Sequence, residues 1–445
     1  MDFIGGMPDF GNILFTFGAF VVALSIIVAI HEYGHYIVGR WSGIYAEVFS
    51  LGFGPVLYSR VDKRGTKWQI AAFPLGGYVK FLGDANAASD RASDDLKDMD
   101  AATLRRTMHG APLWARMATV AAGPVFNFIL SIVVFSGMLF FRGEAVEPPT
   151  IAELQTVPAS VGQVVSGDVI LSIEGQQTSD FSEFYEVTDA LPIEPLLDYT
   201  ISRDGAEQTV QGPYPFPPLV SGIQAGSAAM DAGMEVGDVI VAIDGKEISA
   251  FSELQDIVSA SEGKVLVLDV WRDGEVVEFS LAPRRSDLPM PDGGFETRWL
   301  IGMTGGLFFS PATQTPGIGD ALSYGVEQTY FIAKSSVSGL YHMITGAISS
   351  CNLRGPLGIA ETSGAAASQG ATSFVWFIAM LSTAVGLLNL FPIPVLDGGH
   401  LVFHVYEALT GRPPSDKALR ILMSIGLTLL LSLMVFALSN DLFCP

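Results

Sequence analysis

The stretch FGNILFTFGAFVVALSIIVAIHEYGH, residues 10–35, combines two features that seldom occur together. Residues 10–30 contain no charged side chain and are long enough to cross the roughly 30 Å hydrocarbon layer of a bilayer. The stretch ends in His31-Glu32-Tyr33-Gly34-His35, an H-E-x-x-H pattern. Ionisable side chains at the end of a spanning helix are costly and usually functional. The stretch therefore predicts a metal site in or beside a membrane.

Three further segments are long and apolar enough to span a bilayer, namely residues 117–141, about 373–395 and 421–440. The hydrophobic content of 49% and the mean hydropathy of +0.41 agree with a membrane protein. The first span follows Asp2 and Asp9 without a Lys or Arg, and no small-residue cleavage site follows it. We therefore expect a retained first helix, four spans in all, and the lipid bilayer as a partner.

Charge placement predicts the orientation of these spans. Residues 40–116 hold 11 Lys and Arg, and the link between the last two spans adds Arg412, Lys417 and Arg420. By the positive-inside rule, both segments are expected in the cytoplasm. Residues 142–361 carry 31 Asp and Glu against 10 Lys and Arg, so we expect them outside the cytoplasm. Such acidity also argues against nucleic acid as a partner.

The spacing of the H-E-x-x-H pattern is suited to zinc chemistry. On a helix, His31 and His35 share one face and can bind one metal, while Glu32 can reach a water on that metal as a general base. A catalytic zinc site needs three protein ligands and one open position. Cys351 and Cys444 are the only cysteines, so the third ligand is expected to be a histidine or a carboxylate.

Asp397 is the candidate third ligand. It lies in NLFPIPVLDGGH, residues 389–400, where Pro392 and Pro394 break a regular helix. Irregular backbone at membrane depth is tolerated where it is buried in protein or lines a cavity. Both the first and the third span are expected to run inward, so Asp397 and His31 should meet near the cytoplasmic face. His400 is a rival ligand, which the Gly398-Gly399 turn should direct elsewhere.

The remaining histidines and the cysteines carry less information. We expect His109, His342 and His404 to be surface or packing residues. Both cysteines fall on the expected extracytoplasmic side, where a disulfide persists, but buried free thiols are the simpler interpretation.

Between the spans, two kinds of β-structure are expected. Residues 48–81 alternate apolar runs with glycine around a polar turn at Gly65, which is typical of a β-hairpin. GDVILSIEGQQTSDFSEF begins at Gly167 and GDVIVAIDGKEISAFSEL at Gly237, and ten of their eighteen positions are identical. Two copies of one small domain are therefore expected. Residues 317–350 are expected to form an amphipathic helix, which lies on the membrane or packs against the last spans.

This set of motifs resembles the site-2 protease family, the M50-type intramembrane zinc metalloproteases. The resemblance rests on HEYGH, GPVFN (residues 123–127), two PDZ-like repeats, GPLGI (residues 355–359) and NLFPIPVLDGGH, and it covers essentially the whole chain. It implies a multi-pass α-helical membrane protein of four spans, with a re-entrant β-hairpin at about 48–81 and two extracytoplasmic PDZ-like α+β domains.

The implied domain organisation has five parts. Residues 1–142 and 371–445 would form the two parts of a membrane protease domain. Residues 143–215 and 216–285 would be the first and second PDZ-like domains, followed by an amphipathic connecting segment at 286–370. The second copy matches better, because GSAAMDAGMEVGD precedes its strand, whereas the first has ASVGQVVSGD. A peptide groove in the first copy is accordingly in doubt.

The resemblance also implies an activity and a location. The chain would be a zinc metalloendopeptidase of a bacterial inner membrane, cleaving single-pass transmembrane proteins such as anti-sigma factors in or near their membrane segment. Zn²⁺ would be held by His31, His35 and Asp397, with Glu32 catalytic. Asn389 would bind unwound substrate, or else cap or pack a helix. The PDZ-like pair would recognise peptide termini or exclude substrates with large outer domains.

Two functions of other classes compete with this hypothesis. A metal transporter would use intramembrane His and Asp, but it offers no reason for Glu32 in this spacing, and the halves of the chain show no inverted repeat of spans. An inert membrane scaffold would use the PDZ-like pair to gather partners, but it offers no reason for all four metal and catalytic positions to be present.

Overall fold

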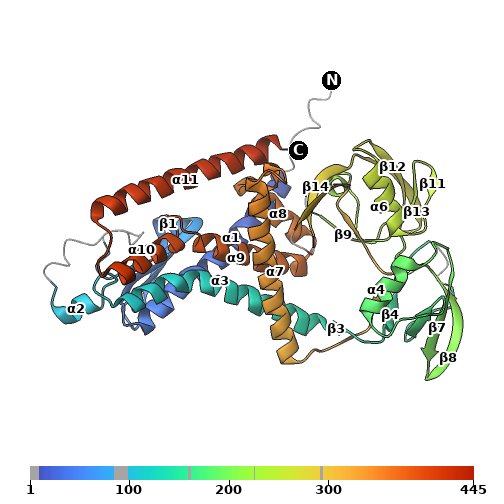
Figure 1. Ribbon diagram of the computed structural model, residues 1–445, viewed down its shortest axis with the longest axis horizontal. Helices are drawn as coiled ribbons and strands as arrows, with labels where there is room; N and C mark the ends of the chain where they lie inside the picture. The colour runs from blue at the N-terminus through green and yellow to red at the C-terminus, as the bar shows by residue number, and fades with distance from the viewer. Residues whose placement is uncertain (1–9, 85–98, 159–161, 225, 291–293, 445) are drawn as a thin grey trace. The chain divides into compact units, whose positions relative to one another are not determined.

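The computed structural model describes residues 10–84, 99–158, 162–224, 226–290 and 294–444 (Figure 1). The chain divides into two compact units. The first contains residues 1–137, 321–341 and 350–445, and the second contains residues 138–320 and 342–349. The first unit is mainly helical, whereas most of the short strands belong to the second.

In the part of the chain that the structure describes, four helices are long and apolar enough to cross a membrane, at Ile13–Trp41, Leu113–Arg142, Ala371–Leu390 and Lys417–Phe443. They lie within α1 (Phe10–Trp41), α3 (Leu113–Arg142), α9 (Ala371–Leu390) and α11 (Asp416–Phe443), which confirms the expected four-span pattern. Two boundaries differ from expectation. Helix α1 continues past His35, so the H-E-x-x-H pattern lies inside it, and α9 ends at Leu390 because Pro392 and Pro394 follow.

Small residues let these helices approach closely in the first unit. A Cβ on Gly34 of α1 would lie 2.5 Å from the Ala122 carbonyl oxygen of α3, and a Cβ on Gly386 of α9 would lie 3.1 Å from the α3 residue Asn127. Helix α1 also contacts α8 (Pro356–Ser368) and α9. Close backbone approach of this kind is the usual way in which spanning helices gain packing contacts in lipid.

The expected hairpin consists of β1 (Ala46–Val61) and β2 (Lys67–Phe81), paired antiparallel with several bulges. Phe49 stacks on Trp68 with ring centroids 4.3 Å apart, and Tyr36 of α1 packs edge-on against both rings. These aromatic contacts fix one part of the hairpin to α1. Side chains elsewhere on it are exposed and apolar, namely Phe53, Val56, Leu57, Tyr58 and Phe73.

In the second unit, the sequence repeat forms two four-stranded antiparallel sheets of equivalent strand order, β6-β5-β7-β8 and β11-β10-β12-β13. Their bounds are Val169–Ile173 (β5), Gln176–Gln177 (β6), Leu197–Arg203 (β7), Ala206–Gly212 (β8), Val239–Ile243 (β10), Lys246–Glu247 (β11), Leu266–Arg272 (β12) and Glu275–Leu281 (β13). Helices α4 (Phe181–Ala190) and α6 (Phe251–Ala260) occupy matching places in the two copies.

The repeated Gly-Asp pair has a structural cause. Asp168 is fully buried and accepts two hydrogen bonds of 2.7 Å from Arg203. Asp238 is also buried and accepts two of 2.6 Å from Arg272. Each bidentate ion pair connects the turn before the first strand of a sheet to the end of its central neighbour, and such pairs are geometrically specific.

The segment 286–370 does more than connect the second copy to the third span. It includes most of β14 (Arg284–Pro289) together with β15 (Phe295–Leu300), β16 (Met303–Gly305), β17 (Phe309–Pro311) and β18 (Thr313–Gln314). β16 pairs with β9 (Val220–Ile223), β17 pairs with β4 (Ile151–Leu154), and β18 pairs with β3 (Glu144–Ala145). The returning chain thus adds strands beside the start of each copy. The expected helix then follows as α7 (Ile318–Ile344).

Cys351 and Cys444 form a disulfide, with their Cα atoms 5.7 Å apart. The interpretation of both as free buried thiols is therefore wrong. Next to the bond, Asp441 of α11 accepts hydrogen bonds from the backbone N–H groups of Gly355 and Leu357 at the start of α8, over 2.7 and 3.1 Å. Disulfide and carboxylate together join the end of the last span to the GPLGI segment, because an unpaired helix N-terminus favours a carboxylate.

Candidate metal centre and active site

Two histidines of α1 and one aspartate meet in the first unit. His31 Nε2 lies 3.2 Å from His35 Nε2, because residues four apart on a helix share a face. Asp397, the first residue of α10 (Asp397–Thr410), brings its Oδ2 to 3.1 Å from His31 Nε2 and 3.5 Å from His35 Nε2. Among the described residues, these three are the only group of side chains placed to share one metal ion.

The spacing of the three atoms suits a tetrahedral metal ion. Ligand atoms about 2.0–2.1 Å from zinc at tetrahedral angles lie about 3.3 Å apart, close to the observed separations. Asp397 Oδ2 is buried, and among the described residues it has no hydrogen-bond partner beyond the two imidazoles that it faces. When both rings offer Nε2 lone pairs, three acceptors converge with no proton between them, and a cation is the group that such a cluster can hold.

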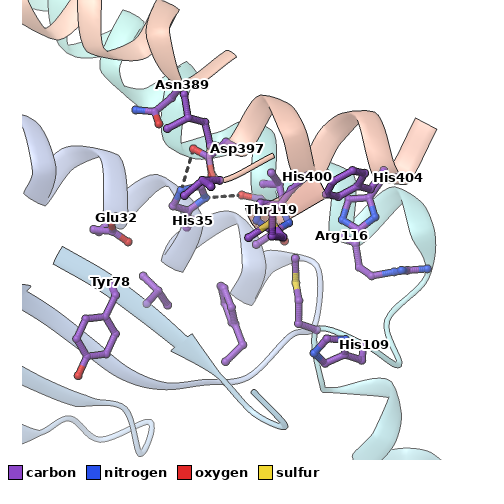
Figure 2. Close-up of a pocket in the computed structure, with 18 of the residues that line it drawn as sticks. Glu32, His35, Tyr78, His109, Arg116, Thr119, Asn389, Asp397, His400 and His404 are labelled. Carbon is purple, nitrogen blue, oxygen red and sulfur yellow. Dashed lines mark hydrogen bonds and ion pairs between the residues drawn. The ribbon is translucent and has the colours of Figure 1, made fainter. Parts of the chain in front are cut away.

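Residues of helix α3 contact the Nδ1 atoms of the two histidines, on the side of each ring away from Asp397. His35 Nδ1 lies 2.8 Å from the carbonyl oxygen of Thr119 (Figure 2), and His31 Nδ1 lies 3.2 Å from Nδ2 of the Asn127 side chain. A carbonyl can only accept, so His35 carries its proton on Nδ1 and presents an Nε2 lone pair. The positions of His31, His35 and Asp397 were predicted from the sequence, but the supporting contacts from α3 were not.

Glu32 follows His31 on α1 and lines the same cavity of about 530 Å³ as the three candidate ligands. A Cβ on Gly77 of β2 would lie 3.1 Å from Glu32 Cγ and 2.8 Å from the Ser50 carbonyl oxygen. Glycine at this position therefore lets the hairpin pass close to the glutamate. Tyr78 and Val79 of β2 line the cavity as well, so a strand edge borders the candidate site.

The residues between α9 and α10 place Asp397. Pro392 and Pro394 prevent α9 from continuing, and the chain turns back so that α10 begins at Asp397. A Cβ on Gly398 would lie 2.5 Å from the Leu390 carbonyl carbon, and one on Gly399 would lie 2.5 Å from the Pro394 Cα. The two glycines thus permit a turn in which the new helix packs against the preceding loop.

Asn389 occupies the last turn of α9 and lines the cavity near Asp397 (Figure 2). Its Nδ2 donates a hydrogen bond of 3.1 Å to the Val385 carbonyl oxygen within its own helix. This contact leaves the two expected roles, substrate binding and helix packing, both open. His400 lies on α10 beyond Asp397 and outside the three-residue group.

Sequence reasoning missed a polar wall of this cavity. His109 and His404, expected at the surface or in packing, line it together with Arg116 and Glu407. Arg116 of α3 donates two hydrogen bonds of 2.7 and 3.0 Å to Glu407 of α10. This bidentate pair holds the helix that carries Asp397 against α3. Burial, and then the charge of Arg116, lowers the pKa of His404 to about 4, so its ring is neutral at pH 7.

The geometry and the fold define a class: a membrane protein with four candidate spans, in which the first span contributes the H-E-x-x-H pattern and the helix after the third span contributes an aspartate to one cluster. The sequence pattern of peptidase family M50 matches residues 19–433, which is most of the chain. The chain belongs to peptidase family M50, the intramembrane zinc metalloproteases.

The sequence similarity to curated relatives extends over nearly the full length of this chain. A protein of Agrobacterium fabrum that is named as a zinc metalloprotease is 34% identical over 431 residues, covering 95% of this chain and 94% of its own. One of Brucella suis with the same type of name is 34% identical over 432 residues, with the same coverage. The regulator of sigma E protease of Salmonella typhimurium is 31% identical over 475 residues, covering 97% of this chain and 99% of its own.

Proposed function

We propose that this chain is a zinc endopeptidase that cleaves single-pass membrane proteins, such as anti-sigma factors, within or near their transmembrane segment. The observation that carries the proposal is the meeting of His31, His35 and Asp397 beside Glu32 in one cavity. Membership of family M50 and the similarity to the regulator of sigma E protease support the substrate class. In this proposal, His31, His35 and Asp397 are zinc ligands.

The proposed chemistry is hydrolysis of a peptide bond. Zinc held by the three ligands supplies a Lewis acid that polarises a carbonyl and lowers the pKa of water to about 7. Glu32 acts as general base, taking a proton from the attacking water and delivering it to the leaving amide nitrogen. Thr119 keeps the proton of His35 on Nδ1, so the ring stays available as a ligand.

The hairpin β1–β2 is proposed to be a re-entrant element that receives the substrate. A transmembrane helix must unwind before a peptide bond can be cut, and an edge strand can pair with the freed backbone groups. The exposed apolar side chains of Phe53, Leu57, Tyr58 and Phe73 suit contact with lipid or with an apolar substrate. Gly77 and Tyr78 of β2 lie at the cavity that contains Glu32.

We infer from the charge pattern that residues 40–116 and 412–420 face the cytoplasm of a bacterial inner membrane, with the acidic region outside. The active site then lies near the cytoplasmic face. Protease added outside intact spheroplasts should reach residues 143–317 and spare the hairpin. Digestion of the hairpin instead would reverse the assignment.

The two repeats are proposed to be PDZ-like domains, at 143–215 and 216–285, completed by β17 and β16 from the returning chain. Their shared sheet order and matching helices support this proposal. We favour a steric filter, which admits substrates with a short outer domain, over recognition of peptide termini.

Neither of the two competing functions, a metal transporter or an inert scaffold, explains why Glu32 lies beside the candidate ligands.

Zinc removal tests the proposed activity. Purified protein in liposomes should cleave a tagged single-pass substrate with a truncated outer domain, and chelator treatment should reduce the rate at least about 100-fold, because the Lewis acid is lost. Readdition of zinc should restore cleavage. The same substrate with a large folded outer domain should be cut poorly if the repeats act as a filter. Full activity of the verified metal-free protein would exclude zinc catalysis.

Asn389 offers a test of substrate binding. For Asn389→Leu, we expect the KM for the single-pass substrate to rise about tenfold while zinc affinity stays unchanged, because an amide that pairs with unwound backbone is lost. If Asn389 only packs α9, the variant should instead have a lower unfolding temperature and an unchanged KM. Initial rates over a range of substrate mole fractions in lipid separate these results.

A further inference from the structure

A buried amide lies beside one of the candidate zinc ligands. Asn127 of α3 is fully buried, and its Nδ2 is 3.2 Å from His31 Nδ1. Its Oδ1 is also buried and has no hydrogen-bond partner among the described residues. A buried amide oxygen without a donor is uncommon and requires an explanation.

The protonation of a ligating histidine supplies the explanation. A neutral imidazole that offers its Nε2 lone pair to a metal carries its proton on Nδ1, so Nδ1 must donate. When Nδ2 of Asn127 faces His31 Nδ1, two N–H donors face each other, and Oδ1 of Asn127 is left without a partner. Rotating the amide by 180° exchanges its oxygen and nitrogen at almost constant shape. Oδ1 then accepts from His31 Nδ1–H.

The surroundings hold Asn127 at this place. Its backbone carbonyl oxygen accepts hydrogen bonds from the Ser131 hydroxyl over 3.0 Å and from the Ser382 hydroxyl of α9 over 2.9 Å. Gly386 of α9 lies so close that a Cβ there would be 3.1 Å from the Asn127 Cβ. The amide is therefore fixed between α3 and α9 and pointed at α1.

The arrangement matches that of the other histidine. Thr119, about two turns earlier on α3, presents its carbonyl oxygen to His35 Nδ1 at 2.8 Å. With the Asn127 amide rotated, α3 thus offers a hydrogen-bond acceptor to Nδ1 of both candidate histidine ligands. Hydrogen-bond acceptors behind metal-binding histidines orient the rings and increase their basicity.

We propose that Asn127 is a positioning residue for the metal centre: its Oδ1 accepts a hydrogen bond from His31 Nδ1–H and holds His31 in the tautomer that directs an Nε2 lone pair towards His35 and Asp397. The inference rests on the proposed zinc site and adds to it a residue of the second span. It assigns GPVFN a role in metal binding as well as in helix packing.

Zinc affinity measured by competition with a chromophoric chelator in detergent tests the proposal. Asn127→Leu, which retains volume but cannot accept, should weaken zinc binding about 10- to 100-fold. Asn127→Asp retains two acceptor oxygens and should stay within about threefold of wild type. Ser363→Ala is the matched control, because Ser363 is equally buried in the same unit and its hydroxyl donates to the Ile359 carbonyl oxygen of its own helix, α8, away from Asn127. Its zinc affinity should not change.

The outcomes distinguish the inference from the proposed function. Wild-type zinc affinity in Asn127→Leu, or an equal loss in Asn127→Asp, would overturn the role of Asn127. Unchanged zinc binding in His31→Ala would instead overturn the zinc site itself. If Asn127→Leu does not fold, ¹⁵N NMR of selectively labelled histidine in zinc-loaded wild type decides, since an unprotonated Nδ1 on His31 contradicts the proposal.

Discussion

Glu32→Gln is expected to reduce the rate of substrate cleavage by about 10²–10⁴-fold while zinc stays bound. Glutamine has nearly the volume of glutamate but cannot accept the proton of the attacking water. The candidate ligands His31, His35 and Asp397 are unchanged in this variant, so metal content measured by atomic absorption should equal that of wild type. Cleavage is measured with the truncated single-pass substrate in liposomes.

Glu47→Gln is the matched control for this experiment. Glu47 belongs to the same unit and forms an ion pair of 2.9 Å with Lys80 on the hairpin, and it does not line the cavity. We expect its rate to remain within about twofold of wild type, because a partly exposed ion pair contributes little. If Glu32→Gln retained more than a tenth of wild-type activity, Glu32 would not be the general base. If wild type does not cleave the substrate, metal transport that is unchanged in Glu32→Gln would favour the transporter. Partner binding that is unchanged in this variant would favour the scaffold.

Gly123→Ala is expected to disrupt the metal centre from the second span. A Cβ at this position would lie 2.5 Å from His35 Cε1 and 2.8 Å from His31 Cε1, and nearer still to His35 Nε2. Real Cβ atoms do not come this close, so one or both rings must move from their present positions. We expect zinc affinity to fall at least about tenfold and cleavage to be lost, because a ligand displaced by a fraction of an ångström leaves the tetrahedral geometry.

Gly137→Ala provides the comparison, because Gly137 lies on the same helix and a Cβ there would meet nothing within 4 Å. This variant should bind zinc like wild type. It should also be slightly more stable in thermal unfolding, since alanine is favoured over glycine inside a helix by about 0.5–1 kcal/mol. Equal zinc affinity in Gly123→Ala and Gly137→Ala would show that the rings tolerate the methyl group and that the close packing of α1 on α3 is not required.

The sequence alone predicted the four candidate spans and the approach of His31, His35 and Asp397. Long apolar runs determine spans because the bilayer penalises every exposed polar group, and the i, i+4 spacing of two histidines on a helix needs no tertiary information. Predicting that Asp397 approaches the histidines needed one further inference. Two spans that run in the same direction bring their ends to the same depth. The repeat at Gly167 and Gly237 predicted two copies of one sheet for a similar reason, since like sequences form like local structure.

Tertiary structure decided what depends on contacts between distant segments. Pairing of β16 with β9 and of β17 with β4 joins residues about 80 or more apart and was invisible to a search for local repeats. The same holds for the disulfide between Cys351 and Cys444, for the Arg116–Glu407 ion pair, and for the contacts that Thr119 and Asn127 make with Nδ1 of the two histidines. Composition and periodicity identify which side chains are suited to a metal, but the packing of α3 on α1 decides which groups face Nδ1 of His31 and of His35.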